Sequence, residues 1–158
     1  MGRLPSIHLR ATRRAPEHAK DVLVIECGAT TRVLECWRQG ILPHELVHAA
    51  VESVFPWRGF VRLVAAGRDP ASIGAREAEP ETLWAEALTN ALQAELAGVI
   101  EPGTAGLRAY LDTIQRSPPL PELAEAELAL VRARIADWNV RWAALRAGES
   151  LDITLEAR

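Results

Sequence analysis

The chain changes its periodicity at Gly40-Ile41-Leu42-Pro43-His44-Glu45-Leu46-Val47-His48. Before this stretch apolar and polar residues alternate, which is typical of strands, and after it the apolar residues recur at helical spacing. Those helical positions are Leu46, Val47, Ala50, Val51 and Val54. Pro43 suits a helix start, because an N–H in the first turn has no helical partner to lose. The stretch therefore predicts the boundary between a β-rich part and a helical part.

The part before the boundary predicts an antiparallel meander. Gly28-Ala29-Thr30 suits a hairpin turn, and Val22-Leu23-Val24-Ile25 is a β-branched run of the kind found in strands. The three predicted strands are residues 7–12, 21–27 and 31–37. We expect these strands to form one small sheet with one buried face.

The part after the boundary is predicted to be helical, with one returning strand. The first helix begins at the motif and ends before Pro56, since proline interrupts helices. The other predicted helices are 60–66, 80–99, 104–116 and 121–146, and the predicted strand is 151–155. The fold class is therefore α+β, a small antiparallel sheet packed against four or five helices.

Length and composition fit one domain spanning residues 1–158. A chain of 158 residues lies within the usual range for single domains, and 49% hydrophobic with 25% charged residues is ordinary for a globular protein. The expected parts are the β-meander at 1–40, the motif helices at 41–67, the helical part at 80–146 and the C-terminal strand at 150–156.

Charge and hydropathy exclude some classes of partner. The net charge is −3 and basic residues form no long stripe, so nucleic-acid binding is disfavoured. No run approaches the roughly 20 apolar residues that span a bilayer, so no membrane association is expected. The first residues lack the apolar core of a signal peptide, and Cys27 and Cys36 are expected to be free thiols. These features together predict a cytoplasmic protein.

The segment His44-Glu45-Leu46-Val47-His48 has the chemistry of a metal site. Residues four apart lie on one face of a helix, so two imidazoles can reach one ion. In zinc peptidases with this HExxH signature the glutamate activates a metal-bound water as general base. The motif predicts a divalent metal, zinc above others, with His44 and His48 as ligands and Glu45 as the catalytic base of a hydrolase.

A catalytic zinc usually has three protein ligands, so a carboxylate must be found elsewhere. Glu86 is the best candidate, because it lies early in a long predicted helix on a polar face with Asn90 and Gln93. Glu52 continues the face of His48, but a straight helix carries it about 12 Å from His44. It could instead orient His48 from behind. Glu81 and Glu95 are weaker choices.

Other interpretations remain open at this point. His44 and His48 also fit a helix start with one partly buried histidine, and Cys36 could serve as a soft ligand. Trp138 and Trp142 lie on a continuous apolar stripe of the last helix, for which burial in the core is the favoured interpretation and a homodimer the alternative. The second functional hypothesis is accordingly a non-catalytic interaction protein that uses its helical half.

The segment at 42–53, with Gly59-Phe60 and the segment at 63–67, resembles a group of small uncharacterised bacterial proteins. Their pattern is Leu-Pro-His-(Asp or Glu)-Leu-x-His-x-x-Val-Glu followed by a Gly-Phe helix, and the resemblance covers about residues 41–67. It implies that His44, His48 and Glu52 are motif positions. An aspartate often stands in that group where Glu45 stands here, which argues against peptidase activity. The group suggests no other activity.

Overall fold

A computed structural model describes residues 5–73, 79–114 and 119–156. Its sheet contains β1 (Ile7–Thr12), β2 (Lys20–Cys27), β3 (Thr30–Trp37) and β4 (Ser150–Leu155). All neighbouring strands are antiparallel, and their order is β3-β2-β1-β4. The predicted meander and its returning C-terminal strand are therefore confirmed, as is the α+β class.

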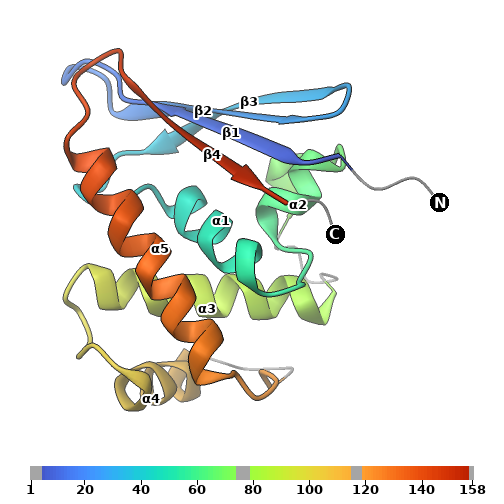
Figure 1. Cartoon of the computed structure of the whole chain (residues 1–158), viewed down its shortest axis with the longest axis vertical. Helices are drawn as coiled ribbons and strands as arrows, with labels where there is room; N and C mark the ends of the chain where they lie inside the picture. The colour runs from blue at the N-terminus through green and yellow to red at the C-terminus, as the bar shows by residue number, and fades with distance from the viewer. Residues whose placement is uncertain (1–4, 74–78, 115–118, 157–158) are drawn as a thin grey trace.

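The sheet has one buried and one open face because its sequence alternates. Ile7, Leu9 and Ala11 of β1 are buried, whereas His8 and Arg10 between them are exposed. The helices lie against the buried face (Figure 1). Val33 and Trp37 of β3 are the most exposed large apolar residues of the open face, each 67% exposed. Hydrophobic alternation therefore decides which face of the sheet receives the helices.

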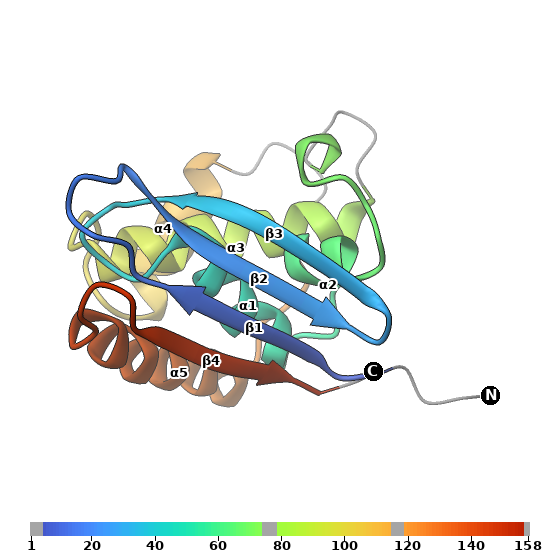
Figure 2. The same cartoon turned by 90° about the horizontal axis from the view of Figure 1, so that it is seen from above.

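Five α-helices and one short 3₁₀ helix follow the meander in the described residues. They are α1 (His44–Val54), α2 (Phe60–Ala65), η1 (Pro70–Ser72), α3 (Pro80–Leu96), α4 (Thr104–Ile114) and α5 (Glu125–Ala143). Helix α1 lies between the sheet and α3 (Figure 1). Seen from above, α5 runs beneath β4, and α2 lies below β2 and β3 (Figure 2). The motif helix is thus the centre of the packing.

Three helix boundaries differ from the prediction by three residues or more, and one of them is the end of α5, at Ala143 rather than Arg146. Helix α3 ends at Leu96 rather than Val99, because Gly98 adopts a φ of +75° and the N–H of Val99 bonds back to the carbonyl of Ala94 at 2.9 Å. This arrangement is a Schellman ending, which a glycine permits. Helix α5 begins at Glu125 rather than Pro121, since Ala124 is extended and Leu123 packs against the core. The predicted end of α4 at 116 and most of the linker after it lie outside the described residues.

The apolar stripe of α5 belongs to the interior of the chain. Its buried residues are Leu128, Val131, Ile135, Trp138 and Trp142. The core interpretation of Trp138 and Trp142 is therefore confirmed, and the homodimer through this helix stays a prediction. None of the helices in the described part of the chain has both the length and the apolar character needed to cross a membrane.

Candidate metal centre

Helix α1 presents two histidines to one side because it starts at the motif. Pro43 stands at the N-cap with an extended backbone, and its carbonyl accepts the N–H groups of Leu46 and Val47. His44 and His48 then follow one turn apart, with ring centroids 4.9 Å from each other and nearly perpendicular planes. His48 is 2% exposed, whereas the side chain of His44 is 31% exposed. One histidine is thus inside the protein and the other at its rim.

Helix α3 brings Glu86 to the two imidazoles. Its buried face, with Ala85, Leu88 and Leu92, packs into the core, and Glu86 lies beside that face with 48% of its side chain exposed. The Oε2 atom of Glu86 is 2.6 Å from Nε2 of His48, and Oε1 is 3.4 Å from Nε2 of His44. Among the described residues, His44, His48 and Glu86 form a group whose ligand atoms lie within 4.8 Å of one another. The predicted third ligand is the carboxylate that the fold brings to the histidines.

Both imidazoles direct Nε2 toward Glu86 because each Nδ1 has a partner of its own. Nδ1 of His44 contacts Oε1 of Gln93, and the amide of Gln93 donates to Oε1 of Gln39 at 3.0 Å. Gln39 in turn donates to the backbone carbonyl of Leu42 at 2.8 Å. A carbonyl can only accept, so this chain of amides presents an oxygen to His44 and makes its Nδ1 the donor. The Nε2 atom of neutral His44 is then free to bind an ion.

His48 is held from behind by two other residues. Its Nδ1 lies 3.3 Å from the hydroxyl of Thr89 and 3.5 Å from Oε2 of Glu52. The ring also packs against Phe60, with centroids 5.7 Å apart. Histidines that bind metals commonly have such a carboxylate or hydroxyl on the second nitrogen. The surroundings of both histidines therefore match those of metal ligands.

His48 and Glu86 each stabilise the charged form of the other. Burial lowers the pKa of His48, but hydrogen bonds to Glu52 and Glu86 outweigh that effect and raise the pKa to about 9. Burial acts to raise the pKa of Glu86, yet His44 and His48 hold it well below its usual range. A metal-free site therefore stores a cation on His48 between two carboxylates.

Glu52 lies behind His48 and outside the group of three. It is fully buried, and its carboxylate accepts backbone N–H groups of Val61 at 3.1 Å and of Arg62 at 2.9 Å. Its oxygen near His48 faces Nδ1 rather than Nε2. The structure thus places Glu52 where the sequence allowed an orienting partner.

The carboxylate of Glu45 lies beside Cys36 and outside the group of three. Burial raises the pKa of the Cys36 thiol, and the carboxylate of Glu45 beside it raises that pKa further. Neither Glu45 nor Cys36 belongs to the group of three. Glu95 is occupied by Arg132, whose Nε donates to it at 2.8 Å. The assignment of Glu45 as a general base stays a prediction.

Two polar residues of the site went unnoticed in the sequence. Thr89 is fully buried in α3, one turn beyond Glu86, and that spacing is a usable signal. Gln39 lies in the loop between β3 and α1, where nothing in its neighbourhood marks it. Its role depends on the contact with Gln93, 54 residues later.

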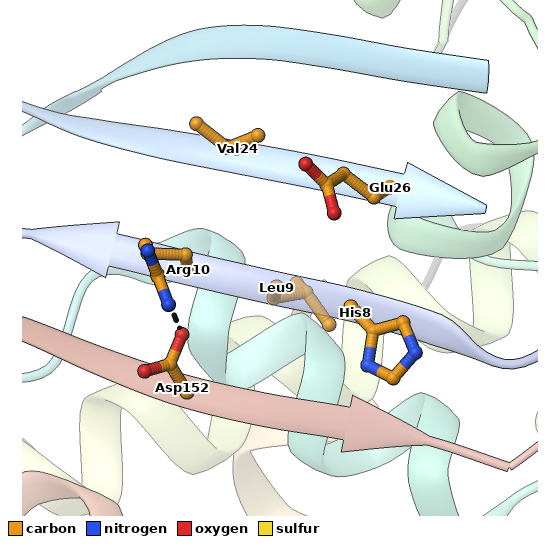
Figure 3. Close-up of a pocket in the computed structure, with 6 residues that line it drawn as sticks. All are labelled: His8, Leu9, Arg10, Val24, Glu26 and Asp152. Carbon is orange, nitrogen blue, oxygen red and sulfur yellow. Dashed lines mark hydrogen bonds and ion pairs between the residues drawn. The ribbon is translucent and has the colours of Figure 1, made fainter. Parts of the chain in front are cut away.

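A pocket lies on the open face of the sheet, apart from the group of three. Its lining residues come from β1, β2 and β4 (Figure 3). The ion pair between Arg10 and Asp152, 2.8 Å long, occupies one end, and His8 bonds the hydroxyl of Thr154. These polar groups already have partners in the protein, so the pocket offers weaker chemistry than the histidine site.

Comparisons with protein-family models, with curated proteins and with solved structures found no match for this chain. The assignment of a function therefore depends on the geometry of the site.

Proposed function

We propose that the chain binds a divalent metal ion through Nε2 of His44, Nε2 of His48 and the carboxylate of Glu86. The observation that carries the proposal is the convergence of these three groups, with each histidine oriented by a partner on Nδ1. Two imidazoles and one carboxylate are a donor set used by catalytic zinc sites. The same set also binds iron in sites with open positions.

The distances between the ligand atoms suit an ion of this kind. In a tetrahedral zinc site with bonds near 2.1 Å, neighbouring ligand atoms are about 3.4 Å apart. His44 and Glu86 are already 3.4 Å apart, whereas His48 and Glu86 are 2.6 Å apart through their hydrogen bond. Because the side chain of Glu86 is 48% exposed, it has room to move back by about 1 Å.

The decisive experiment compares the four histidines of the chain in pairs. Protein purified without added metal is analysed by mass spectrometry for metal per chain, then again after exposure to zinc, iron or manganese. The native chain is expected to hold close to one ion, and the His44→Ala/His48→Ala variant none. The matched control is His8→Ala/His18→Ala, which removes two exposed histidines. A native chain that takes up none of the three metals contradicts the proposal.

We further propose that the bound ion is zinc and that it serves hydrolysis. Three protein ligands leave a position for water, and the exposed side of Glu86 leaves the site reachable from solvent. Glu45 is the proposed general base, as the motif predicts, and this role requires its carboxylate to turn from Cys36 toward the ion.

The Glu45→Gln variant tests the hydrolase. It is expected to retain the metal and to lose hydrolysis of a panel of chromogenic esters, phosphate esters and peptides by at least about 100-fold. Undiminished hydrolysis by Glu45→Gln would remove Glu45 from the mechanism while leaving the metal site intact.

A further inference from the structure

Glu52 is a buried carboxylate that links α1 to the start of α2. It lies in α1, one turn after His48, and its two oxygens accept the N–H groups of Val61 and Arg62 at the start of α2. Nη2 of Arg62 donates back to the backbone carbonyl of Glu52 at 2.9 Å. The side chain of Glu52 therefore has little freedom to rotate, because two backbone N–H groups bind its carboxylate. Arg62 also binds the backbone carbonyl of the same residue.

The chain also leaves the space that this carboxylate needs. A Cβ atom on Gly59 would lie 2.6 Å from Cδ of Glu52, 2.7 Å from its Oε2 and 2.8 Å from Cβ of Ala85. The φ of Gly59 is −89°, which any residue can adopt. Glycine is therefore required at this position by the close approach of Glu52 and α3, and not by the backbone.

The clamped oxygen is the one that meets His48. Oε2 of Glu52 accepts the N–H of Val61 and lies 3.5 Å from Nδ1 of His48, at the outer limit of a hydrogen bond. A carboxylate only accepts, so it favours the form of the imidazole that carries its proton on Nδ1. In the metal-free protein Nε2 also carries a proton, which it shares with Glu86 at 2.6 Å; an ion that displaced this proton would find the lone pair on Nε2, with Nδ1 still protonated.

From this geometry we infer that Glu52 is a positioning residue of the metal site: it orients His48 for the ion without being a ligand, and Gly59 makes room for it. The inference rests on the proposed function, and it assigns to Glu52 a role other than the metal ligation that its motif position suggests. Carboxylates in this position typically change metal affinity by about 10–100-fold.

The test must separate positioning from capping of α2, because Glu52 does both. Glu52→Gln keeps the size of the side chain but removes the charge and one accepting oxygen. The matched control is Asp21→Asn, since Asp21 is 2% exposed, accepts a backbone N–H from Arg14 and lies in β2, outside the group of His44, His48 and Glu86. Both variants are expected to lose stability. Only Glu52→Gln is expected to weaken zinc binding, by about 10–100-fold in competition with a chelating dye.

A spectroscopic measurement on metal-free protein completes the test. With ¹⁵N-labelled histidine, the Nδ1 proton of His48 is expected to exchange slowly with solvent in the native chain and in Asp21→Asn, and rapidly in Glu52→Gln. Because this signal needs no metal, a native chain that binds no ion overturns the proposed function alone. If the Glu52→Gln variant binds zinc as tightly as the native chain and its His48 proton still exchanges slowly, the positioning role is overturned.

If Glu52→Gln does not fold, the Gly59→Ala variant tests the positioning role instead. This variant retains the carboxylate but pushes it from its place, so zinc affinity is expected to fall several-fold and the exchange of the His48 proton to quicken. Unchanged affinity and exchange in a folded Gly59→Ala protein likewise overturn the inference.

Discussion

Asp21 and Glu52 are two buried carboxylates in different parts of the molecule, and their partners differ. Asp21 accepts the N–H of Arg14 and pairs with the guanidinium of Arg38, with Nη2 2.6 Å from Oδ1. Glu52 accepts two backbone N–H groups, its Oε2 atom lies 3.5 Å from Nδ1 of His48, and the guanidinium of Arg62 donates to its backbone carbonyl at 2.9 Å. Arginine is charged at every relevant pH, whereas histidine is not.

The partners of the two carboxylates differ because Asp21 has a structural role, whereas Glu52 lies beside the candidate metal centre. A buried charge is costly without a counter-charge, so the permanent cation of Arg38 completes the surroundings of Asp21. The carboxylate of Glu52 instead faces a group that can lose its charge, His48, or, under our proposal, a metal ion on the other side of that ring, while Arg62 binds the backbone carbonyl of Glu52. The first pair holds β2 to the neighbouring loops, and the second makes stability depend on what occupies the site.

The largest expected effect comes from truncating each carboxylate. Glu52→Ala removes the acceptor of two backbone N–H groups in a fully buried place, and we expect it to lower the free energy of unfolding by about 3–5 kcal/mol. Asp21→Ala removes the acceptor of one backbone N–H, so we expect a loss of about 1–3 kcal/mol. Denaturation by guanidinium chloride, followed by tryptophan fluorescence, measures both. Equal losses would mean that the two carboxylates do the same structural work.

The next effect separates the carboxylates by their response to zinc. A ligand at 100 times its Kd stabilises the folded state by about 2.7 kcal/mol. The native chain and Asp21→Asn are expected to gain this amount at the same zinc concentration, and Glu52→Gln less, because its Kd is higher. Thermal unfolding with and without zinc measures the gain. A smaller gain in Asp21→Asn than in Glu52→Gln would reverse the roles assigned to the two residues.

The third effect is a pH dependence of opposite sign in the two regions. The pKa of His48 is raised to about 9, mainly by Glu52 and Glu86 against the effect of burial, so its contribution is fully present below its unfolded pKa near 6.5 and is lost as pH rises through about 9. In metal-free protein this loss is expected to be on the order of 3 kcal/mol, and His48→Gln should abolish it. A native chain equally stable at pH 6.5 and pH 9.5 would contradict this pairing.

Asp21 contributes to the pH dependence of stability on the acid side. Burial acts to raise its pKa, but the hydrogen bonds of Arg38 and Arg14 lower it overall. Its contribution is therefore present above the unfolded pKa near 3.9 and is lost as pH falls through the folded value. Unfolding temperatures below pH 5 should fall less steeply in Asp21→Asn than in the native chain, while the alkaline limb stays unchanged.

The parts of the site that follow from local spacing could be predicted from the sequence. His44 and His48 are four residues apart in a segment of helical period, so their common face needed no knowledge of the fold. The alternation in β1 likewise marked its buried face. Glu86 was selected because it lies on the polar face of a long predicted helix. Its approach to His48 is a contact between residues 38 positions apart in the sequence, which local spacing does not predict.

The sequence by itself determined the α+β class, the four-stranded sheet and the two histidines on one helix face, because the periods of strands and helices are set by the backbone within a few residues. The tertiary structure determines which carboxylate meets the histidines, why Glu52 faces Nδ1 of His48 and not Nε2, and how Gln39 and Gln93 orient His44. Those contacts depend on how α3 is rotated against α1 and where α2 begins. Packing of the buried side chains sets both, and no local pattern encodes them.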